Sequence, residues 1–388
     1  MGDEAIALHK KLRGKIIVKG KISVLKNNKI KLIYTPGVAA VCEKIYRNPN
    51  LKYELTSKWN NVAIVTDGTR ILGLGNIGPD AALPVMEGKS VLYQEFGGVS
   101  AFPICLNTTK KDEIITTIRA IEPVFGAINL EDIESPKVLE ISEELEKLIS
   151  IPVFHDDRHG TAVVVLAALI NSFRLLKKDM SSSKIVIAGA GSAGYGIAKL
   201  LTAAGCKNLL VTDSGGVIYK GRTENMNKYK DELADITNPK KEKGMLGDVL
   251  VNGDVFIGVS GRSNLVNSIM IQKMKPNPIV FSLTNPNPEI QPDVAKKAGA
   301  KIMATGSYLY PNKVNNALVF PHLMRAILDK RIKKITTDIL LVAANAIANT
   351  VSSKDLDYEH ILPEMEDKKI QKNLSKALAG ISTKKLKS

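Results

Sequence analysis

The stretch KIVIAGAGSAGYGIAKLLTAAGCKNLLVTD, residues 184–213, decides the fold. Residues 184–188 predict a buried strand, and residues 194–204 predict the helix that follows it. The next apolar run, 208–212, predicts a second strand, and Asp213 stands at its end. A strand, a Gly-x-Gly-x-x-Gly turn, a helix and an acidic residue after the second strand are the order found in dinucleotide-binding folds.

Each glycine of the turn has its own physical reason. Gly189 permits the tight turn, Gly191 lets the backbone approach a pyrophosphate, and Gly194 lets the helix pack closely on the strand. The N–H groups at the helix N-terminus would then face the phosphates. The predicted cofactor-binding residues are Gly189, Gly191, Ser192, Ala193, Gly194 and Asp213.

The residue pattern leaves the choice between NAD and NADP open. Asp213 could accept hydrogen bonds from the adenosine ribose hydroxyls, which favours NAD. A 2′-phosphate would instead require a cation, and Lys220 and Arg222 lie a short way downstream.

The pattern around this unit predicts an α/β protein with two domains. Apolar runs at 255–259, 279–283 and 301–304 continue the alternation of strand and helix, which indicates a doubly wound parallel sheet of Rossmann type with helices on both faces. Upstream, strands at 62–65 and 102–106 mix with helices at 111–121 and 135–149. We expect a mixed α/β catalytic domain over 1–158, a dinucleotide-binding domain over 159–319, and C-terminal helices within 320–388 that rejoin the first domain.

The composition favours a protein that binds an anionic small molecule over a nucleic-acid-binding or membrane protein. The formal net charge is +15, from 54 Lys and Arg against 39 Asp and Glu, which suits an anionic small molecule. Aromatic residues are not interleaved with the basic termini, which argues against a nucleic-acid platform. The longest apolar stretch, 161–170, is too short to span a bilayer. Three scattered cysteines, Cys42, Cys105 and Cys206, predict a reducing cytoplasm without disulfides.

Carboxylates follow two short apolar runs. Glu131 and Asp132 follow the first, and Asp156 and Asp157 follow the second. Oxygen ligands at strand ends suit a hard cation such as Mg²⁺ or Mn²⁺. Tyr34, beside a Pro-Gly turn, and Lys89, after Gly88, are side chains that can act as an acid and a base, although their spacing alone favours an ordinary role, as a half-buried tyrosine and a surface lysine.

Taken together, the motifs resemble the malic enzymes in their short microbial form. The resemblance covers nearly the whole chain and rests on YTPGVA (34–39), TDGTRILGLGNIGP (66–79), ALPVMEGKS (82–90), NLEDI (129–133), FHDDRHGTA (154–162), GAGSAG (189–194), NPNPE (285–289) and YPNKVNNALVFP (310–321). It implies metal-dependent oxidative decarboxylation of L-malate, a dicarboxylate, to pyruvate and CO₂ with reduction of NAD or NADP. It further implies decarboxylation of oxaloacetate and a homodimer or higher homo-oligomer.

The resemblance also assigns roles. Lys89 matches the general base, Tyr34 the general acid, and Asp156 a residue that positions the lysine. The implied metal ligands are Glu131, Asp132 and Asp157, and the implied substrate-binding residues are Arg70, Asn285, Asn315 and Asn316. Which of the two adjacent asparagines faces substrate stays open. Arg158 and His322 depart from the family pattern, which calls for a glutamine-like residue and a glycine at these positions.

Two alternative functions remain open at this point. One is a dinucleotide-binding regulatory module without turnover, and the other is a cofactor-independent oxaloacetate decarboxylase. The set of Tyr34, Lys89 and the three carboxylates argues against the first, and omission of the dinucleotide from an assay would test the second.

Overall fold

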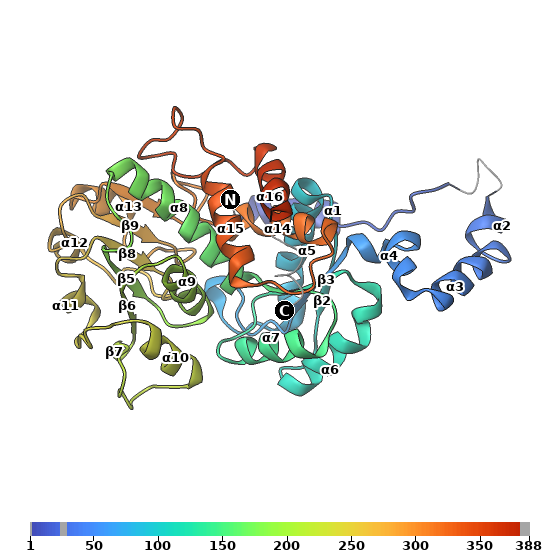
Figure 1. Ribbon diagram of the computed structural model, residues 1–388, viewed down its shortest axis with the longest axis horizontal. Helices are drawn as coiled ribbons and strands as arrows, with labels where there is room; N and C mark the ends of the chain where they lie inside the picture. The colour runs from blue at the N-terminus through green and yellow to red at the C-terminus, as the bar shows by residue number, and fades with distance from the viewer. Residues whose placement is uncertain (1, 24–28, 381–388) are drawn as a thin grey trace.

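The protein is described by a computed structural model that covers residues 2–23 and 29–380. Two sheets occupy different halves of the molecule, with a long helix running between them (Figure 1). This arrangement confirms the predicted fold class: a mixed α/β half, a Rossmann-type half and further helices at the C-terminal end.

The first sheet has four parallel strands in the order β2-β1-β3-β4. They are β1 (Asn61–Thr66), β2 (Ser100–Cys105), β3 (Ala127–Leu130) and β4 (Val153–His155). Its helices are α5 (Gly78–Gly97), which packs on β2, and α6 (Lys111–Ile121) and α7 (Lys137–Leu148), which pack on each other. Because the strands are parallel, the loops after β1, β3 and β4 leave from one edge of the sheet.

The second sheet has the order β10-β9-β8-β5-β6-β7 and is parallel except for β7. Its strands are β5 (Lys184–Ala188), β6 (Asn208–Asp213), β7 (Gly216–Val217), β8 (Val255–Gly258), β9 (Ile279–Ser282) and β10 (Ile302–Thr305). Neighbouring side chains along β5 enter different cores: Ile185 and Ile187 join one cluster and Val186 the other. Helices therefore cover both faces, as the continuous apolar strands predicted.

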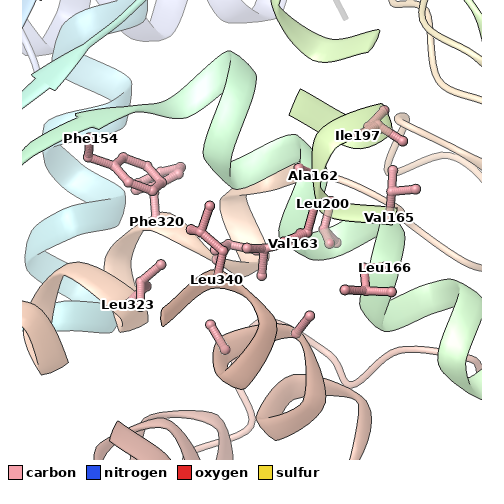
Figure 2. Close-up of a cluster of buried hydrophobic side chains, with 14 of the residues drawn as sticks. Phe154, Ala162, Val163, Val165, Leu166, Ile197, Leu200, Phe320, Leu323 and Leu340 are labelled. Carbon is pink, nitrogen blue, oxygen red and sulfur yellow. The ribbon is translucent and has the colours of Figure 1, made fainter. Parts of the chain in front are cut away.

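The helix α8 (Thr161–Leu176) links the two halves. Most of its side chains are buried, and it packs against α9 (Ser192–Ala203) and α15 (Thr337–Ala348). Figure 2 shows Val163, Val165 and Leu166 among side chains from the neighbouring helices. The helical run 156–176 is long and apolar enough to cross a membrane, but 72% of its most apolar window is buried inside the protein, as in a core helix.

The C-terminal helices pack back onto both halves. The helix α14 (Phe320–Asp329) contacts α5, and α16 (Lys369–Ala379) contacts α14 and α15. The sequence after Asp367 reads as polar, yet it contains α16, because Ile370, Leu374 and Leu378 recur every four residues and form a buried stripe.

An N-terminal arm, residues 29–51, projects from the body (Figure 1). It consists of α2 (Ile30–Ile33), α3 (Gly37–Arg47) and η1 (Pro49–Leu51), and none of its helices has a buried residue. The remaining elements are α1 (Gly2–Leu12), α4 (Lys52–Leu55), η2 (Ser57–Asn60), η3 (Leu72–Leu74), η4 (Glu122–Val124), η5 (Asp156–Gly160), α10 (Lys228–Ile236), α11 (Leu246–Leu250), α12 (Ser268–Gln272), α13 (Pro292–Lys297) and η6 (Asn316–Leu318).

Candidate active site

A cleft of about 760 Å³ lies where the carboxyl ends of the two sheets face each other. Its lining from the first half includes Arg70, Lys89, Glu131, Asp132 and Asp157. Its lining from the second half and the following segment includes Gly191, Ser192, Ala193, Asn285, Asn315 and Asn316. The fold thus brings most of the sequence-predicted residues to one place, at the carboxyl ends of parallel strands where α/β proteins bind ligands.

Lys89 lies at the floor of this cleft, on α5, and is only 7% exposed. Its Nζ donates to Glu131 Oε1 at 2.7 Å and also to Asp156 Oδ2. The ring of Phe320 lies beneath the ammonium, 4.0 Å from Nζ to the ring centroid. Burial opposes the lysine's charge, but the carboxylates of Asp156 and Glu131 outweigh it and raise its pKa. The two carboxylates therefore favour the protonated form of the lysine.

The carboxyl groups around Lys89 also have raised pKa values, which for an acid disfavours the charged form. Burial, followed by repulsion from Asp157 and Glu131, raises the pKa of Asp132 to about 9. Burial raises the pKa of Asp156 to about 7 and that of Asp157 to about 6, against the attraction of Lys89. Several carboxyl groups thus share one cleft with too little positive charge to keep all of them ionised at neutral pH.

This excess of carboxylates fits a divalent cation. Glu131, Asp132 and Asp157 line the cleft from the ends of β3 and β4, and Asp156 Oδ1 is buried without a hydrogen-bond partner. Oxygen donors of this kind are what Mg²⁺ and Mn²⁺ prefer. Across residues 2–23 and 29–380, however, no group of three such side chains is arranged around a point where a cation could sit. Glu131 in particular is turned toward Lys89.

Two residues that the sequence interpretation did not single out complete this cluster. Asn129 Nδ2 donates to Glu131 Oε2 at 2.8 Å, and its Oδ1 accepts from the Tyr93 hydroxyl at 2.6 Å. Both residues are buried, so their bonds fix the orientation of Glu131. The four-residue spacing from Lys89 to Tyr93 places both on one face of α5, a signal that could have identified Tyr93.

The glycine turn has the geometry of a dinucleotide cradle. Gly189 has φ +118°, and a Cβ there would lie 2.5 Å from the Val259 carbonyl oxygen. A Cβ on Gly194 would lie 1.8 Å from the Gly189 carbonyl oxygen, whereas a Cβ on Gly191 would meet nothing within 4 Å. The first and third positions thus require glycine for packing, and the second leaves open space where a pyrophosphate can approach.

Asp213 ends β6, beside the glycine turn, as its predicted role requires. Its carboxylate also accepts hydrogen bonds from Arg222, Lys230, Asn225 and the backbone N–H of Gly215. Lys220 points elsewhere and pairs with Asp235 at 2.8 Å.

The predicted substrate-binding residues all reach the cleft. Arg70 follows β1, and its backbone N–H donates to the Asp132 carbonyl at 3.0 Å. Asn315 is used within the chain: its Nδ2 donates to the Gly306 carbonyl at 2.8 Å and its Oδ1 accepts from the backbone N–H of Ala317 at 2.9 Å. No side-chain hydrogen bond of this kind holds Asn316 within the described residues, so Asn316 is the better placed of the pair to contact substrate.

Glu289 was quoted only as part of a motif, yet it organises the second half of the cleft. It is fully buried and accepts hydrogen bonds from the backbone N–H and hydroxyl of Ser260, the backbone N–H and hydroxyl of Thr284, and the hydroxyl of Ser282. It thereby ties the loop after β8 to the loop after β9, which carries Asn285.

Tyr34, unlike Lys89, does not line the cleft of its own chain. It lies on the arm between α2 and α3 and is 69% exposed. The two departures from the family pattern lie nearer the body. The Arg158 guanidinium stacks over Tyr195, 5.2 Å from the ring centroid, and His322 is buried with Nε2 3.3 Å from the Met365 carbonyl oxygen.

Comparison with known proteins agrees with this geometry. Residues 14–113 match the malic enzyme N-terminal domain, and residues 159–382 match the malic enzyme NAD-binding domain. The bifunctional malic/malolactic enzyme of Bacillus subtilis (strain 168) is 48% identical, with 97% of this chain and 92% of that protein covered. The NADP-dependent malic enzyme of Escherichia coli (strain K12) is 39% identical over 94% of this chain and 50% of its own length.

A solved structure gives the same result. The NAD-dependent malic enzyme of Thermotoga maritima superposes with a TM-score of 0.92 at 44% sequence identity, covering 97% of this chain and 99% of that one.

Proposed function

The chain belongs to the malic enzyme family and catalyses the NAD(P)-dependent oxidative decarboxylation of malate, and we propose that Lys89 is the base of this reaction. The observation that carries the proposal is the contact of the buried Lys89 Nζ with both Asp156 and Glu131, in a cleft that the glycine turn also lines. The regulatory module and the cofactor-independent decarboxylase are not favoured by the comparisons.

The lysine has to lose its proton before it can act as a base. Its pKa is raised because Asp156 and Glu131 both face it. We propose that Glu131, Asp132 and Asp157 would hold a divalent cation, whose positive charge near Lys89 would favour the neutral form of the lysine. Asp156 keeps the lysine aimed into the cleft.

Residues of the chain bind and orient the substrate. Arg70 binds one carboxylate of malate, and Asn285 and Asn316 orient the other end. Neutral Lys89 takes the proton of the C2 hydroxyl as the C2 hydride leaves, and loss of CO₂ from the resulting keto acid gives an enol that is reprotonated at carbon. When bound, the dinucleotide accepts the hydride and the divalent cation supplies Lewis acidity.

The proton donor for that last step is assigned to Tyr34, and its position implies a second subunit. The arm exposes large apolar side chains: Leu32 of α2 is 70% exposed, Tyr34 between α2 and α3 is 69% exposed, and Tyr46 of α3 is 87% exposed. The amphipathic helix α3 has no core to cover it within the described residues. We propose a homodimer in which each arm packs on the partner and places Tyr34 in the partner's cleft.

Subunit complementation tests this arrangement. Tyr34→Phe and Lys89→Met are each expected to be inactive as homodimers. Co-expressed, they form heterodimers in which one of the two clefts holds both an intact Tyr34 and an intact Lys89, so about a quarter of the wild-type activity returns. No recovery from verified heterodimers would contradict the exchange of arms.

The activity itself is tested with a matrix of cofactor, substrate and metal. Malate with Mn²⁺ and either NAD or NADP should raise the absorbance of the reduced nicotinamide, and omission of Mn²⁺ should abolish the signal. We also expect decarboxylation of oxaloacetate with Mn²⁺, which tests the metal-assisted half of the reaction alone. The free thiols of Cys42, Cys105 and Cys206 agree with the cytoplasm as the proposed compartment.

The domain division also remains a proposal. We infer that residues 1–158 and the C-terminal helices form the catalytic domain, since α14 packs on α5, and that residues 159–319 bind the dinucleotide.

A further inference from the structure

The loop after β1 forms a tight turn whose residues Leu72, Gly73 and Gly75 line the cleft. The backbone N–H of Ile71 donates to the Gly75 carbonyl at 2.9 Å, and that of Leu74 donates to the Ile71 carbonyl at 3.0 Å. Ile71 is buried, whereas the side chains of Leu72 and Leu74 are exposed. Leu72 has φ +47°, a left-handed conformation that a bulky side chain rarely adopts. Such a conformation persists where the surrounding structure holds it in place.

Gly73, between the two exposed leucines, lies against the cofactor half of the molecule. A Cβ on Gly73 would lie 2.9 Å from Pro286 Cδ and 3.1 Å from the Asn285 carbonyl oxygen, and outside its own turn its three nearest atoms all belong to these two residues. Both residues follow β9. Non-bonded carbon atoms pack at about 3.5–4.0 Å, so a methyl group at position 73 would have to push the two loops apart by at least about 0.6 Å.

A second glycine makes a similar contact from the other side of the cleft. Gly261, in the loop after β8, has φ +72°, and a Cβ there would lie 3.1 Å from Arg70 Nη2. The Gly261 backbone N–H donates to the Thr284 hydroxyl oxygen at 3.0 Å, and that hydroxyl donates to Glu289 at 2.5 Å. The loops that carry Gly261 and Asn285 are therefore held on the same buried carboxylate, and they meet the first half as one connected surface.

These two contacts lie beside the residues that are proposed to bind malate. Arg70 comes three residues before Gly73, and Asn285 is one of the two residues that Gly73 touches. Arg70 and Asn285 line the same cleft, one from each half. The distance between the group that binds one carboxylate and the group that orients the other end is therefore set where the two halves touch.

We propose that Gly73 is a positioning residue that determines the length of the substrate. Because position 73 has no side chain, the halves approach until Arg70 and Asn285 are spaced for a four-carbon 2-hydroxy dicarboxylate. A side chain at this position would hold the halves apart, and the site would then favour a longer dicarboxylate. The proposal rests on the proposed function, because it uses the substrate roles of Arg70 and Asn285.

Competition between dicarboxylates of different length tests this spacing. Tartronate, malate and 2-hydroxyglutarate are 2-hydroxy dicarboxylates with three, four and five carbons, and malate should have the highest affinity for wild type. In Gly73→Ala, the KM of malate and the inhibition constant of tartronate should rise at least about tenfold. The inhibition constant of 2-hydroxyglutarate should stay within about twofold of wild type. Alanine can adopt the backbone conformation of Gly73, whose φ is not positive, so the variant tests the contact between the loops.

Leu74→Ala is the matched control, because it alters the same turn at an exposed side chain that does not line the cleft. Its three constants should stay within about twofold of wild type. Gly261→Ala is the second variant, and it decides the question if a circular-dichroism melt shows that Gly73→Ala does not fold. Its Cβ would push Arg70 away from the cofactor half, so malate should again lose more affinity than 2-hydroxyglutarate.

The ratio of the constants separates a positioning role from a structural one. An equal rise of all three constants in Gly73→Ala would show a structural role only and overturn the proposal, and so would three unchanged constants. Wild-type affinity for 2-hydroxyglutarate equal to that for malate would overturn it as well. Each of these results leaves malate oxidation by wild type intact, whereas the absence of that oxidation would overturn the proposed function and this inference with it.

Discussion

The carboxylates at the end of the first sheet and those at the end of the second have opposite surroundings. Asp132, Asp156 and Asp157 have raised pKa values because they are buried beside one another with few donors. Asp213 and Glu289 accept several hydrogen bonds each from groups on neighbouring loops and, for Lys230, on α10. The first set stores unfavourable charge that a cation or a proton can relieve, and the second set holds loops in place.

This difference teaches how to separate reacting carboxylates from structural ones in a fold where both follow strands. An acidic residue that follows a strand can be either reactive or structural. Which role it has depends on whether its oxygens already accept hydrogen bonds from the protein.

Among the variants that test this difference between the two sets of carboxylates, Lys89→Met is expected to lose the most activity. The variant removes the ammonium between Asp156 and Glu131 but keeps an apolar side chain of similar length over Phe320. We expect kcat for malate oxidation to fall by about 10³ to 10⁴. A circular-dichroism melt verifies folding, and a kcat within about tenfold of wild type would remove the lysine from the reaction.

A pair of variants tests the two sets directly. Glu289→Gln puts an NH₂ group against the backbone N–H of either Ser260 or Thr284, since these donors bond to different carboxylate oxygens, so we expect the free energy of unfolding to fall by about 3 kcal/mol. Asp156→Asn should change it by less than about 1 kcal/mol in the absence of metal, yet lower kcat at least about 100-fold. Urea titrations and steady-state rates measure both, and the comparison fails if the two variants behave alike.

The pH dependence gives a smaller effect with a definite sign. Because the folded pKa values of Asp132, Asp156 and Asp157 lie above those of an unfolded chain, the folded protein keeps more protons, and metal-free stability should fall as pH rises from about 5 to 9. Mn²⁺ needs the ionised carboxylates, so its apparent affinity should rise at least about tenfold from pH 6 to pH 8. Thermal melts with and without Mn²⁺ measure both trends, and a metal affinity independent of pH would contradict them.

The smallest effect is expected from Asp213→Asn. The folded pKa of Asp213 is lowered, so its contribution is present above the unfolded pKa and is lost as pH falls through the folded one. We expect a loss of about 1 kcal/mol at pH 7 that becomes smaller once the pH falls below the unfolded pKa of aspartate. Urea denaturation at pH 7 and at acidic pH tests this, and an equal loss at both would show that charge is not involved.

Much of this could be predicted from the sequence, because it is local. The strands at 184–188 and 208–212 were predicted from continuous apolar runs. The turn of 189–194 was predicted from its three glycines, each of which has its own steric requirement. The carboxylates after β3 and β4 were found because parallel strands bring such residues to one edge.

What the sequence could not show depends on contacts between distant segments. The donors that saturate Asp213 come from the loop and helix after β7, and those of Glu289 come from two different loops. The exposure of Tyr34 likewise could not be predicted from its motif, since the motif does not show that this segment lies on an arm that projects from the body.

One turn of the chain has a mechanical consequence. Residues 156–160 form a π-helical turn that runs directly into α8, and α8 packs along α9 in the cofactor half. A Cβ on Gly160 would lie 2.1 Å from Asp156 Oδ1, so only glycine fits at this position beside the aspartate. Because the turn and α8 form one continuous run, a rotation of α8 would also turn Asp156 and Asp157. The position of the cofactor half and the direction of these two carboxylates are therefore mechanically coupled.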